Sequence, residues 1–153
     1  IWLKYYRFNA LNSREASDIE KTIITSRWQV TSDRQLISFV AENERDQIIV
    51  DACNLLYIES MDNYSMFVFL KDGNLVKQTL RGSLRFFESN ISIPAISRCH
   101  RSFIVNLYNV VHIEGNAQGY ILTLNHDNLN VPVSRKYGPI IKEMYNKMLV
   151  KRP

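Results

Sequence analysis

Short apolar runs separated by turn-forming residues fill this 153-residue chain from residue 35 onward, and this pattern limits the folds open to it. The runs are rich in β-branched and aromatic side chains, which favour strands. Turn residues interrupt them about every 8 to 12 residues, as they do in sandwiches and barrels. We predict strands at 36–40, 47–50, 55–58, 66–70, 75–80, 110–113, 120–124 and 129–133. The chain is therefore expected to be mainly β.

Two hairpins can be predicted from turns that contain glycine. Asp72-Gly73 stands between two of the apolar runs, and glycine accepts the positive φ that a tight hairpin turn requires. A second pair of runs flanks residues 115–119, which begin and end with glycine, and we predict that this whole segment is a turn.

Helical signals are fewer than strand signals. Ser83 can cap a short helix that carries Leu84 and Phe87. Pro139 suits the start of a last helix because its missing N–H is not needed there. On this helix, helical spacing predicts an apolar face made of Ile140, Ile141, Met144, Met148 and Leu149.

Residues 1–34 are predicted to form an N-terminal helix and a linker, ahead of a domain at 35–150. Residues 13–27 are the predicted helix, and a capping box at 17–20 supports it. Its narrow apolar stripe can either pair with a second copy, giving a homodimer, or dock on the domain. Residues 1–8 interleave aromatics with cations, as helices do where they leave the cytoplasmic face of a membrane. Either a transmembrane helix precedes Ile1 in the parent protein, or these aromatics pack on the domain.

Composition indicates the cellular compartment of the chain and the charge of its partners. No apolar run approaches the roughly 18 to 20 residues that span a bilayer, and two cysteines are too few for a secreted disulfide scaffold. We therefore expect a cytoplasmic domain, tethered to the inner face of the membrane if a transmembrane helix precedes it. The net charge of +4 permits nucleic acid as a partner. Residues 89–113 contain no acidic residue, so this segment is either a candidate anion surface or a chance cluster of two arginines.

Patterns that support catalysis are missing from the sequence. It has no Gly-x-Gly-x-x-Gly, P-loop or Gly-x-Ser-x-Gly motif, and paired carboxylates are not evident. The three histidines fall on different predicted elements, without the spacing that holds a metal. We predict that the protein is not an enzyme and has no cofactor and no metal site.

Three polar windows lie at predicted turns or strand ends, where binding residues usually sit. They cover residues 61–65, 97–106 and 132–137. The planar fork of Arg101 can read guanine or clamp a phosphate, and the adjacent cations Arg135 and Lys136 precede a helix N-terminus that can hold an anion. Ordinary turn chemistry and solvated cations are the alternatives for these windows.

Cys99 lies between Arg98 and His100, neighbours that can lower the pKa of its thiol. This placement suggests a redox role as one hypothesis. The alternative is a small residue of the core, which is the more common use of a lone cysteine in a strand.

Four segments together resemble one family, the LytTR-type DNA-binding domain of bacterial transcription regulators. They are 56–64, the string Arg-Cys-His-Arg-Ser-Phe-Ile-Val-Asn at 98–106, 115–120 and 131–137. The resemblance covers roughly residues 35 to 150, in the family's order and spacing. The Gly-Asn-Ala-Gln-Gly segment with Pro-Val-Ser-Arg is similar to a Bacteroidetes-like branch, in which some proteins carry the domain after a membrane region.

The resemblance implies an elongated stack of small antiparallel sheets with short helices, which binds double-stranded DNA through loops that enter major grooves. It implies base contacts from Tyr64, Arg101 and Arg135. The positions that it implies as supporting or phosphate-contacting are Asn63, Ser65, Arg98, His100, Ser102, Asn106, Ser134 and Lys136. We therefore expect a sequence-specific DNA-binding domain of a bacterial transcription regulator, of the kind that forms the output domain of a response regulator. The alternative is a β-rich protein-interaction or sensory module without nucleic-acid specificity.

Overall fold

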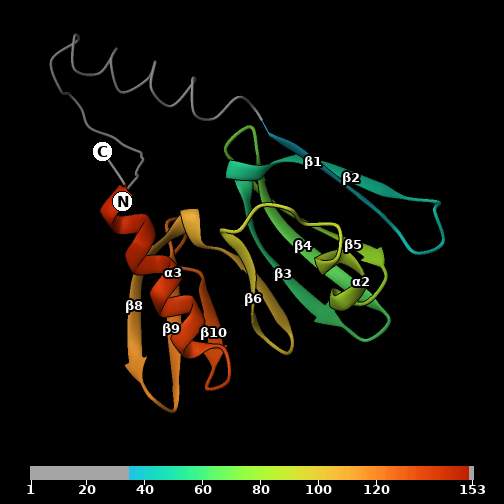
Figure 1. Cartoon of the computed structure of the whole chain (residues 1–153). Helices are drawn as coiled ribbons and strands as arrows, with labels where there is room; N and C mark the ends of the chain where they lie inside the picture. Colours follow the sequence, from blue (N-terminus) through green and yellow to red (C-terminus); the bar gives the residue numbers. More distant parts are fainter. Residues whose placement is uncertain (1–34, 152–153) are drawn as a thin grey trace, which may run out of the picture.

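The computed structural model describes residues 35–151, without the side chain of Lys151, so the predicted N-terminal helix and linker lie outside the described residues. In this part the chain forms three antiparallel sheets and two α-helices (Figure 1). Within these residues, no helix has the length and apolar character needed to cross a membrane. The predictions of a mainly β fold and of small antiparallel sheets with short helices are confirmed.

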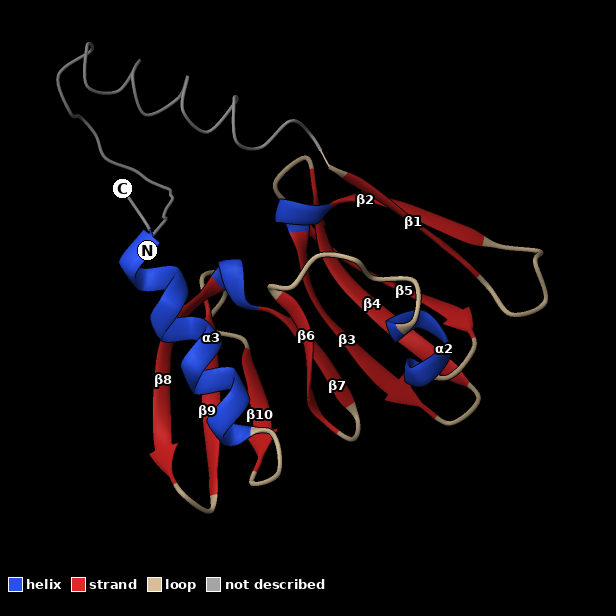
Figure 2. Cartoon of the chain, in the orientation of Figure 1, coloured by secondary structure: helices blue, strands red, loops and turns tan. Residues whose placement is uncertain are grey.

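The sheets follow one another along the chain (Figure 2). A two-stranded ribbon contains β1 (Leu36–Val40) and β2 (Gln47–Asp51). The central sheet has the order β5-β4-β3-β7-β6, with bounds Asn74–Arg81, Tyr64–Lys71, Leu55–Met61, Phe103–Asn106 and Ile96–His100. The third sheet has the order β10-β9-β8, with bounds Asn130–Ser134, Gly119–Leu124 and Val110–Asn116.

The four helical segments are short connections, apart from the last. The 3-10 turns η1 (Ala52–Asn54) and η2 (Leu107–Asn109) lead into β3 and β8. Helix α2 (Leu84–Glu88) follows β5, and α3 (Gly138–Lys151) ends the described chain. Figure 1 shows α3 lying over the three-stranded sheet.

A phenylalanine cluster joins the ribbon to the central sheet. Phe39 of β1, Phe67 of β4 and Phe87 of α2 are each fully buried. The ring centroids of Phe39 and Phe67 lie 4.8 Å apart, and those of Phe67 and Phe87 lie 5.1 Å apart. The predicted cap of α2 is confirmed, because Ser83 Oγ accepts a hydrogen bond from the Phe86 N–H at 3.1 Å. These two ring contacts therefore hold β1, β4 and α2 together.

The two predicted hairpins form, but one turn is tighter than expected. Asp72 and Gly73 both have positive φ and connect β4 to β5 with two residues. The segment predicted as a turn at 115–119 is mostly strand, since Asn116 pairs directly with Gly119 and only 117–118 turn. A Cβ at Gly115 would lie 2.3 Å from the Gly119 carbonyl oxygen. Gly115 allows close approach of two strands, so the prediction that the whole of 115–119 is a turn was wrong.

The apolar face of α3 is narrower than predicted. Ile141 and Tyr145 are buried, and Met144 and Met148 are half-buried beside them. Ile140 is 57% exposed and Leu149 is 46% exposed, so assigning both of these residues to the inner face was wrong. The observed stripe runs at spacings of three and four residues, which keeps one helix face on the sheet.

Two buried asparagines join the central sheet to the three-stranded one. Asn106 Nδ2 donates to the carbonyl oxygens of Ala52 and Leu55, at 2.7 and 2.8 Å. Asn109 Nδ2 donates to Leu55 O at 2.8 Å and to Cys53 O at 3.1 Å. We call Asn106 and Asn109 the asparagine junction. It ties η2, which leads into β8, to the start of β3.

Candidate nucleic-acid interface

Four loops lie on one side of the molecule. In the view of Figure 2, the β3–β4, β6–β7 and β8–β9 turns and the β10–α3 connection all open toward the lower edge. The β3–β4 turn, the β6–β7 turn and the β10–α3 connection belong to the three polar windows of the sequence. The β8–β9 turn is a fourth loop beside them. We call this row of loops the loop edge.

At the β3–β4 turn, an arginine that the sequence analysis missed lies beside Tyr64. Asp62 and Asn63 form the turn, with Asp62 at φ 57°, and Tyr64 begins β4 with 44% of its surface exposed. Arg81 pairs with Tyr64 across β4 and β5, and its guanidinium carbon lies 5.6 Å from the centre of the Tyr64 ring. The two-residue turn at Asp72-Gly73 fixes the register of this hairpin, so counting outward from it predicts this pairing.

Ser65 supports the same turn from inside the protein. Its side chain is fully buried, and its hydroxyl donates to the Gly82 carbonyl at 2.9 Å. The Gly82 N–H donates to the Asn63 carbonyl at 3.0 Å. Of the two roles that the resemblance implies for Ser65, this geometry fits support of the turn and not contact with phosphate.

The second window is a hairpin whose tip is Arg101-Ser102, between β6 and β7. Arg101 is exposed, and among the described residues no carboxylate is paired with it. The Ser60 N–H donates to the Ser102 carbonyl at 2.9 Å, which ties the tip to the end of β3. His100 is half-buried, and its Nδ1 accepts from the Ser102 N–H at 3.0 Å.

Arg98 holds this hairpin and is mostly covered. Its Nε donates to the His100 carbonyl at 2.9 Å, and its Nη2 donates to the Arg101 carbonyl at 2.7 Å. Its Nη1 forms a 2.8 Å ion pair with Glu88 at the end of α2. With 19% side-chain exposure, this guanidinium has three partners within the protein itself, and this geometry fits support of the turn.

Asn106 likewise lies away from any surface. It is fully buried in the asparagine junction, and its Oδ1 accepts from the Tyr108 N–H at 3.1 Å. Its hydrogen bonds therefore lie within the protein interior.

Cys99 belongs to the core. The side chain is fully buried, and burial raises the pKa of its thiol to about 12, although the nearby Arg98 charge acts to lower this pKa. The expectation of a thiol with a lowered pKa was wrong because loss of hydration outweighs the neighbouring cation. This geometry supports the packing alternative and removes the basis of the redox hypothesis.

The third window forms the connection between β10 and α3. Ser134 ends β10, and Arg135 and Lys136 are both exposed in the turn that follows. Arg135 Nη1 donates to Gln118 Oε1 at 3.3 Å, so the β8–β9 turn touches this connection. Lys136 Nζ lies 5.4 Å from the centre of the Tyr137 ring. Gln118 was not predicted as a site residue, because its link to Arg135 depends on the pairing of three strands.

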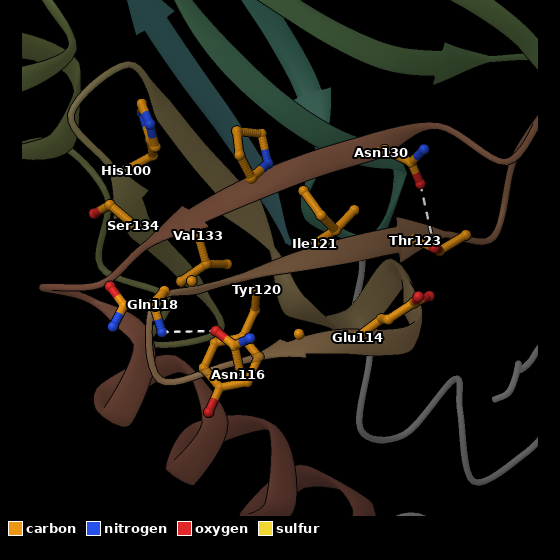
Figure 3. Close-up of a pocket in the computed structure, with 13 residues that line it drawn as sticks. His100, Glu114, Asn116, Gln118, Tyr120, Ile121, Thr123, Asn130, Val133 and Ser134 are labelled. Atoms are coloured by element: carbon orange, nitrogen blue, oxygen red, sulfur yellow. Dashed lines mark hydrogen bonds between the residues drawn. The ribbon is translucent and has the colours of Figure 1, made fainter.

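A groove of about 690 Å³ lies beside this connection (Figure 3). His100 lines it from the β6–β7 hairpin, and Ser134 lines it from β10. Residues such as Ile121 and Thr123 form its floor on the three-stranded sheet. The second and third windows therefore border one continuous surface.

A series of contacts connects the three windows along the loop edge. Asn63 contacts Gly82, Ser60 contacts Ser102, His100 and Ser134 share the groove, and Arg135 contacts Gln118. The exposed cations along this edge are Arg81, Arg101, Arg135 and Lys136. Within residues 35–151 no group of His, Cys, Asp and Glu side chains could hold a metal ion. This edge offers cations and neutral donors, which suit a polyanion.

Comparison with known proteins gives a family match for most of this region. Residues 45–146 match the family described as the LytTr DNA-binding domain. The LytTr DNA-binding domain of a Bacillus cereus response regulator has a similar structure, with a TM-score of 0.57 and 24% sequence identity. That similarity covers 71% of this chain and 94% of the other. At this level of identity, it establishes a shared fold.

Two curated relatives carry the name transcriptional regulatory protein BtsR. They come from Salmonella typhi and Salmonella typhimurium, and each is 28% identical to this chain over 137 residues. The alignment covers 84% of this chain and 55% of each relative. The chain thus spans about half the length of these relatives.

Proposed function

The chain belongs to the LytTr DNA-binding domain family, and from this premise we propose that its loop edge binds double-stranded DNA in a sequence-specific way. The family is one of DNA-binding domains and not of enzymes. The observation that carries the proposal is the row of four loops on one side, with Tyr64, Arg101 and Arg135 all exposed along it.

Base contacts are proposed for these three side chains. The guanidinium groups of Arg101 and Arg135 can each donate two hydrogen bonds to guanine O6 and N7 in the major groove. Tyr64 offers a ring face and a hydroxyl, and the neighbouring Arg81 adds a charge for the phosphate backbone.

The other loop residues are proposed to act in two groups. Asn63, Ser102, Ser134 and Lys136 lie in or beside the tips and are proposed to contact phosphate. Ser65, Arg98, His100 and Asn106 are proposed to support the tips from behind, as their internal hydrogen bonds suggest.

Selection of binding sites from random duplexes, followed by titration of the selected duplex, tests the proposal. Arg101→Ala and Arg135→Ala should each cost about 1 to 3 kcal/mol and relax the preference at particular base pairs. Lys136→Ala should weaken binding to all sequences alike and reduce the salt slope by about 1. Lys71→Ala is the matched control, because it removes a cation at the end of β4 opposite to Tyr64.

Two results would contradict the proposal. Arg101→Ala would retain full site discrimination if this side chain did not read bases. Affinity for duplex DNA that stayed constant between two salt concentrations would favour the alternative, a protein-interaction module.

We also propose that the domain serves a cytoplasmic transcription regulator and that each copy contacts one half-site. Curated relatives named as transcriptional regulatory proteins support this wider role. The stripe on residues 13–27 is the proposed dimer contact, and the aromatic and cationic residues 1–8 are the basis for proposing an upstream membrane region. The mass of the protein in solution and the upstream gene sequence test these two points.

A further inference from the structure

We propose that Arg98 and Glu88 form a positioning device that fixes the β6–β7 turn and so determines which base pair Arg101 reads. This inference rests on the proposed function. It adds α2, which carries Glu88, to the elements that determine specificity, although α2 itself is not one of the loops of the edge.

The first argument comes from the donors of Arg98. A guanidinium has five N–H donors in one plane. Two of the Arg98 nitrogens donate to consecutive carbonyls, those of His100 and Arg101, and a third donates to Glu88. One rigid plane therefore holds both peptide groups around the Cα of Arg101, which limits how the turn can rotate.

The second argument comes from the other side of the turn. The Ser102 N–H donates to His100 Nδ1, and the Ser102 carbonyl accepts from the Ser60 N–H. The backbone is thus bonded on both sides of Arg101, while its own side chain extends outward. Such a turn presents Arg101 with little backbone freedom left to lose on binding.

The third argument comes from the anchor of Glu88. This residue ends α2, and the helix is fixed by the buried side chains of Leu84 and Phe87 and by the Ser83 cap. The Glu88 side chain is 44% exposed, and exposed ion pairs contribute little to stability. Its function in the device is geometric, since it orients the plane of the Arg98 guanidinium.

Electrostatics alone predicts a different result for a Glu88→Ala variant. A carboxylate close to DNA repels phosphate, so its removal should raise affinity. The positioning device predicts that Glu88→Ala instead lowers discrimination at the base pair read by Arg101, by about 5-fold or more. Discrimination at the base pair read by Arg135 should stay unchanged.

The experiment compares variants on the selected duplex and on duplexes with single base-pair changes. Glu88→Gln keeps an acceptor for Arg98 and should retain discrimination within about twofold. Arg98→Lys keeps the charge but not the planar fork and should lose discrimination as Glu88→Ala does. Glu143→Ala is the control, because it removes an exposed acid of α3 that pairs with Lys147.

Two further readouts separate positioning from contact or folding. Arg98→Gln, which removes the charge, should leave the salt slope unchanged, whereas loss of a phosphate contact would reduce it by about 1. In an Arg101→Ala background, Glu88→Ala should cause no additional loss of discrimination, since both act on the same base pair. Circular dichroism checks that each variant is folded. If Arg98→Lys does not fold, the comparison of Glu88→Ala with Glu88→Gln tests the positioning device.

The outcomes distinguish this inference from the proposed function. If Glu88→Ala raises affinity and keeps discrimination while Arg101→Ala loses it, the positioning device is wrong and the base-reading role stands. If Arg101→Ala itself discriminates like the unchanged protein, the proposed role of Arg101 is wrong. Loss of discrimination at both base pairs in Glu88→Ala would indicate general loosening and would also overturn the device.

Discussion

Asn106→Ala should destabilise the fold strongly, because it removes three hydrogen bonds from a fully buried side chain. Nδ2 donates to Ala52 O at 2.7 Å and to Leu55 O at 2.8 Å, and Oδ1 accepts from the Tyr108 N–H at 3.1 Å. Leu55 O keeps a donor in Asn109, but the buried Ala52 carbonyl loses this one. The substitution therefore removes bonds and also leaves a buried acceptor poorly satisfied.

The magnitude follows from these bonds. The bonds to Leu55 O and from the Tyr108 N–H contribute about 1 kcal/mol net each, and the buried Ala52 carbonyl that loses this donor costs about 1 to 3 kcal/mol. We expect the free energy of unfolding to fall by about 3 to 5 kcal/mol. Asn106→Asp should be at least as harmful, because it keeps the Oδ1 acceptor but places a second oxygen against two carbonyls.

Urea unfolding followed by circular dichroism measures this loss. The control is Asn130→Ala, an exposed side chain whose Oδ1 accepts from Thr123 Oγ1 at 3.2 Å, and it should change stability by less than about 0.5 kcal/mol. A loss below about 1 kcal/mol for Asn106→Ala, or an Asn106→Asp variant as stable as the unchanged protein, would refute the reasoning.

Other predictions concern turns, thiols and the loop edge. Gly115→Ala should disrupt the β8–β9 hairpin, since its Cβ would overlap backbone, whereas Gly73→Ala, with nothing within 4 Å, should cost only backbone strain of about 1 kcal/mol; thermal unfolding compares them. In a Cys53→Ser variant at pH 8, Cys99 should react with a thiol reagent on the order of a thousandfold more slowly in the folded protein than in the unfolded protein. Equal reaction rates in the two states would contradict the burial of Cys99. The same variant should lose stability as pH rises above about 8.5, because the unfolded thiol ionises while the folded one stays protonated up to about 12; denaturant titrations across this range measure the slope. Arg81→Ala should weaken binding to all duplexes alike and reduce the salt slope by about 1, and an unchanged slope would exclude a phosphate contact.

Local features of the fold were predictable from the sequence because their causes are local. The Asp72-Gly73 turn and the Ser83 cap depend on residues next to them in the chain, and both predictions were confirmed. The family was also predicted correctly, because its motifs are contiguous strings. The width of the β8–β9 turn was not predictable in this way, since Gly115 is required by the strand that returns beside it.

The supporting residues of the candidate site were harder to predict, because their partners are distant in sequence. Asn106 bonds to carbonyls 51 and 54 residues away, and Arg98 meets Glu88 only when α2 packs beside β6 and β7. An arginine at a predicted turn indicates an anion site, but the guanidinium of Arg98 donates to backbone carbonyl oxygens of the turn instead. Arg81 is different, because the register of a two-residue hairpin was enough to place it opposite Tyr64.

The asparagine junction also controls how far the β8–β9 turn, at the far end of the third sheet, can move. Asn109 stands at the base of β8, which is seven residues long and extends about 23 Å at about 3.3 Å per residue. On a lever of that length, a tilt of about 3° at the base moves the tip by about 1 Å, enough to spoil a hydrogen bond to a base edge. Small repacking at this remote pivot would therefore shift Gln118, and Arg135 with it, without any change in the residues that face the duplex.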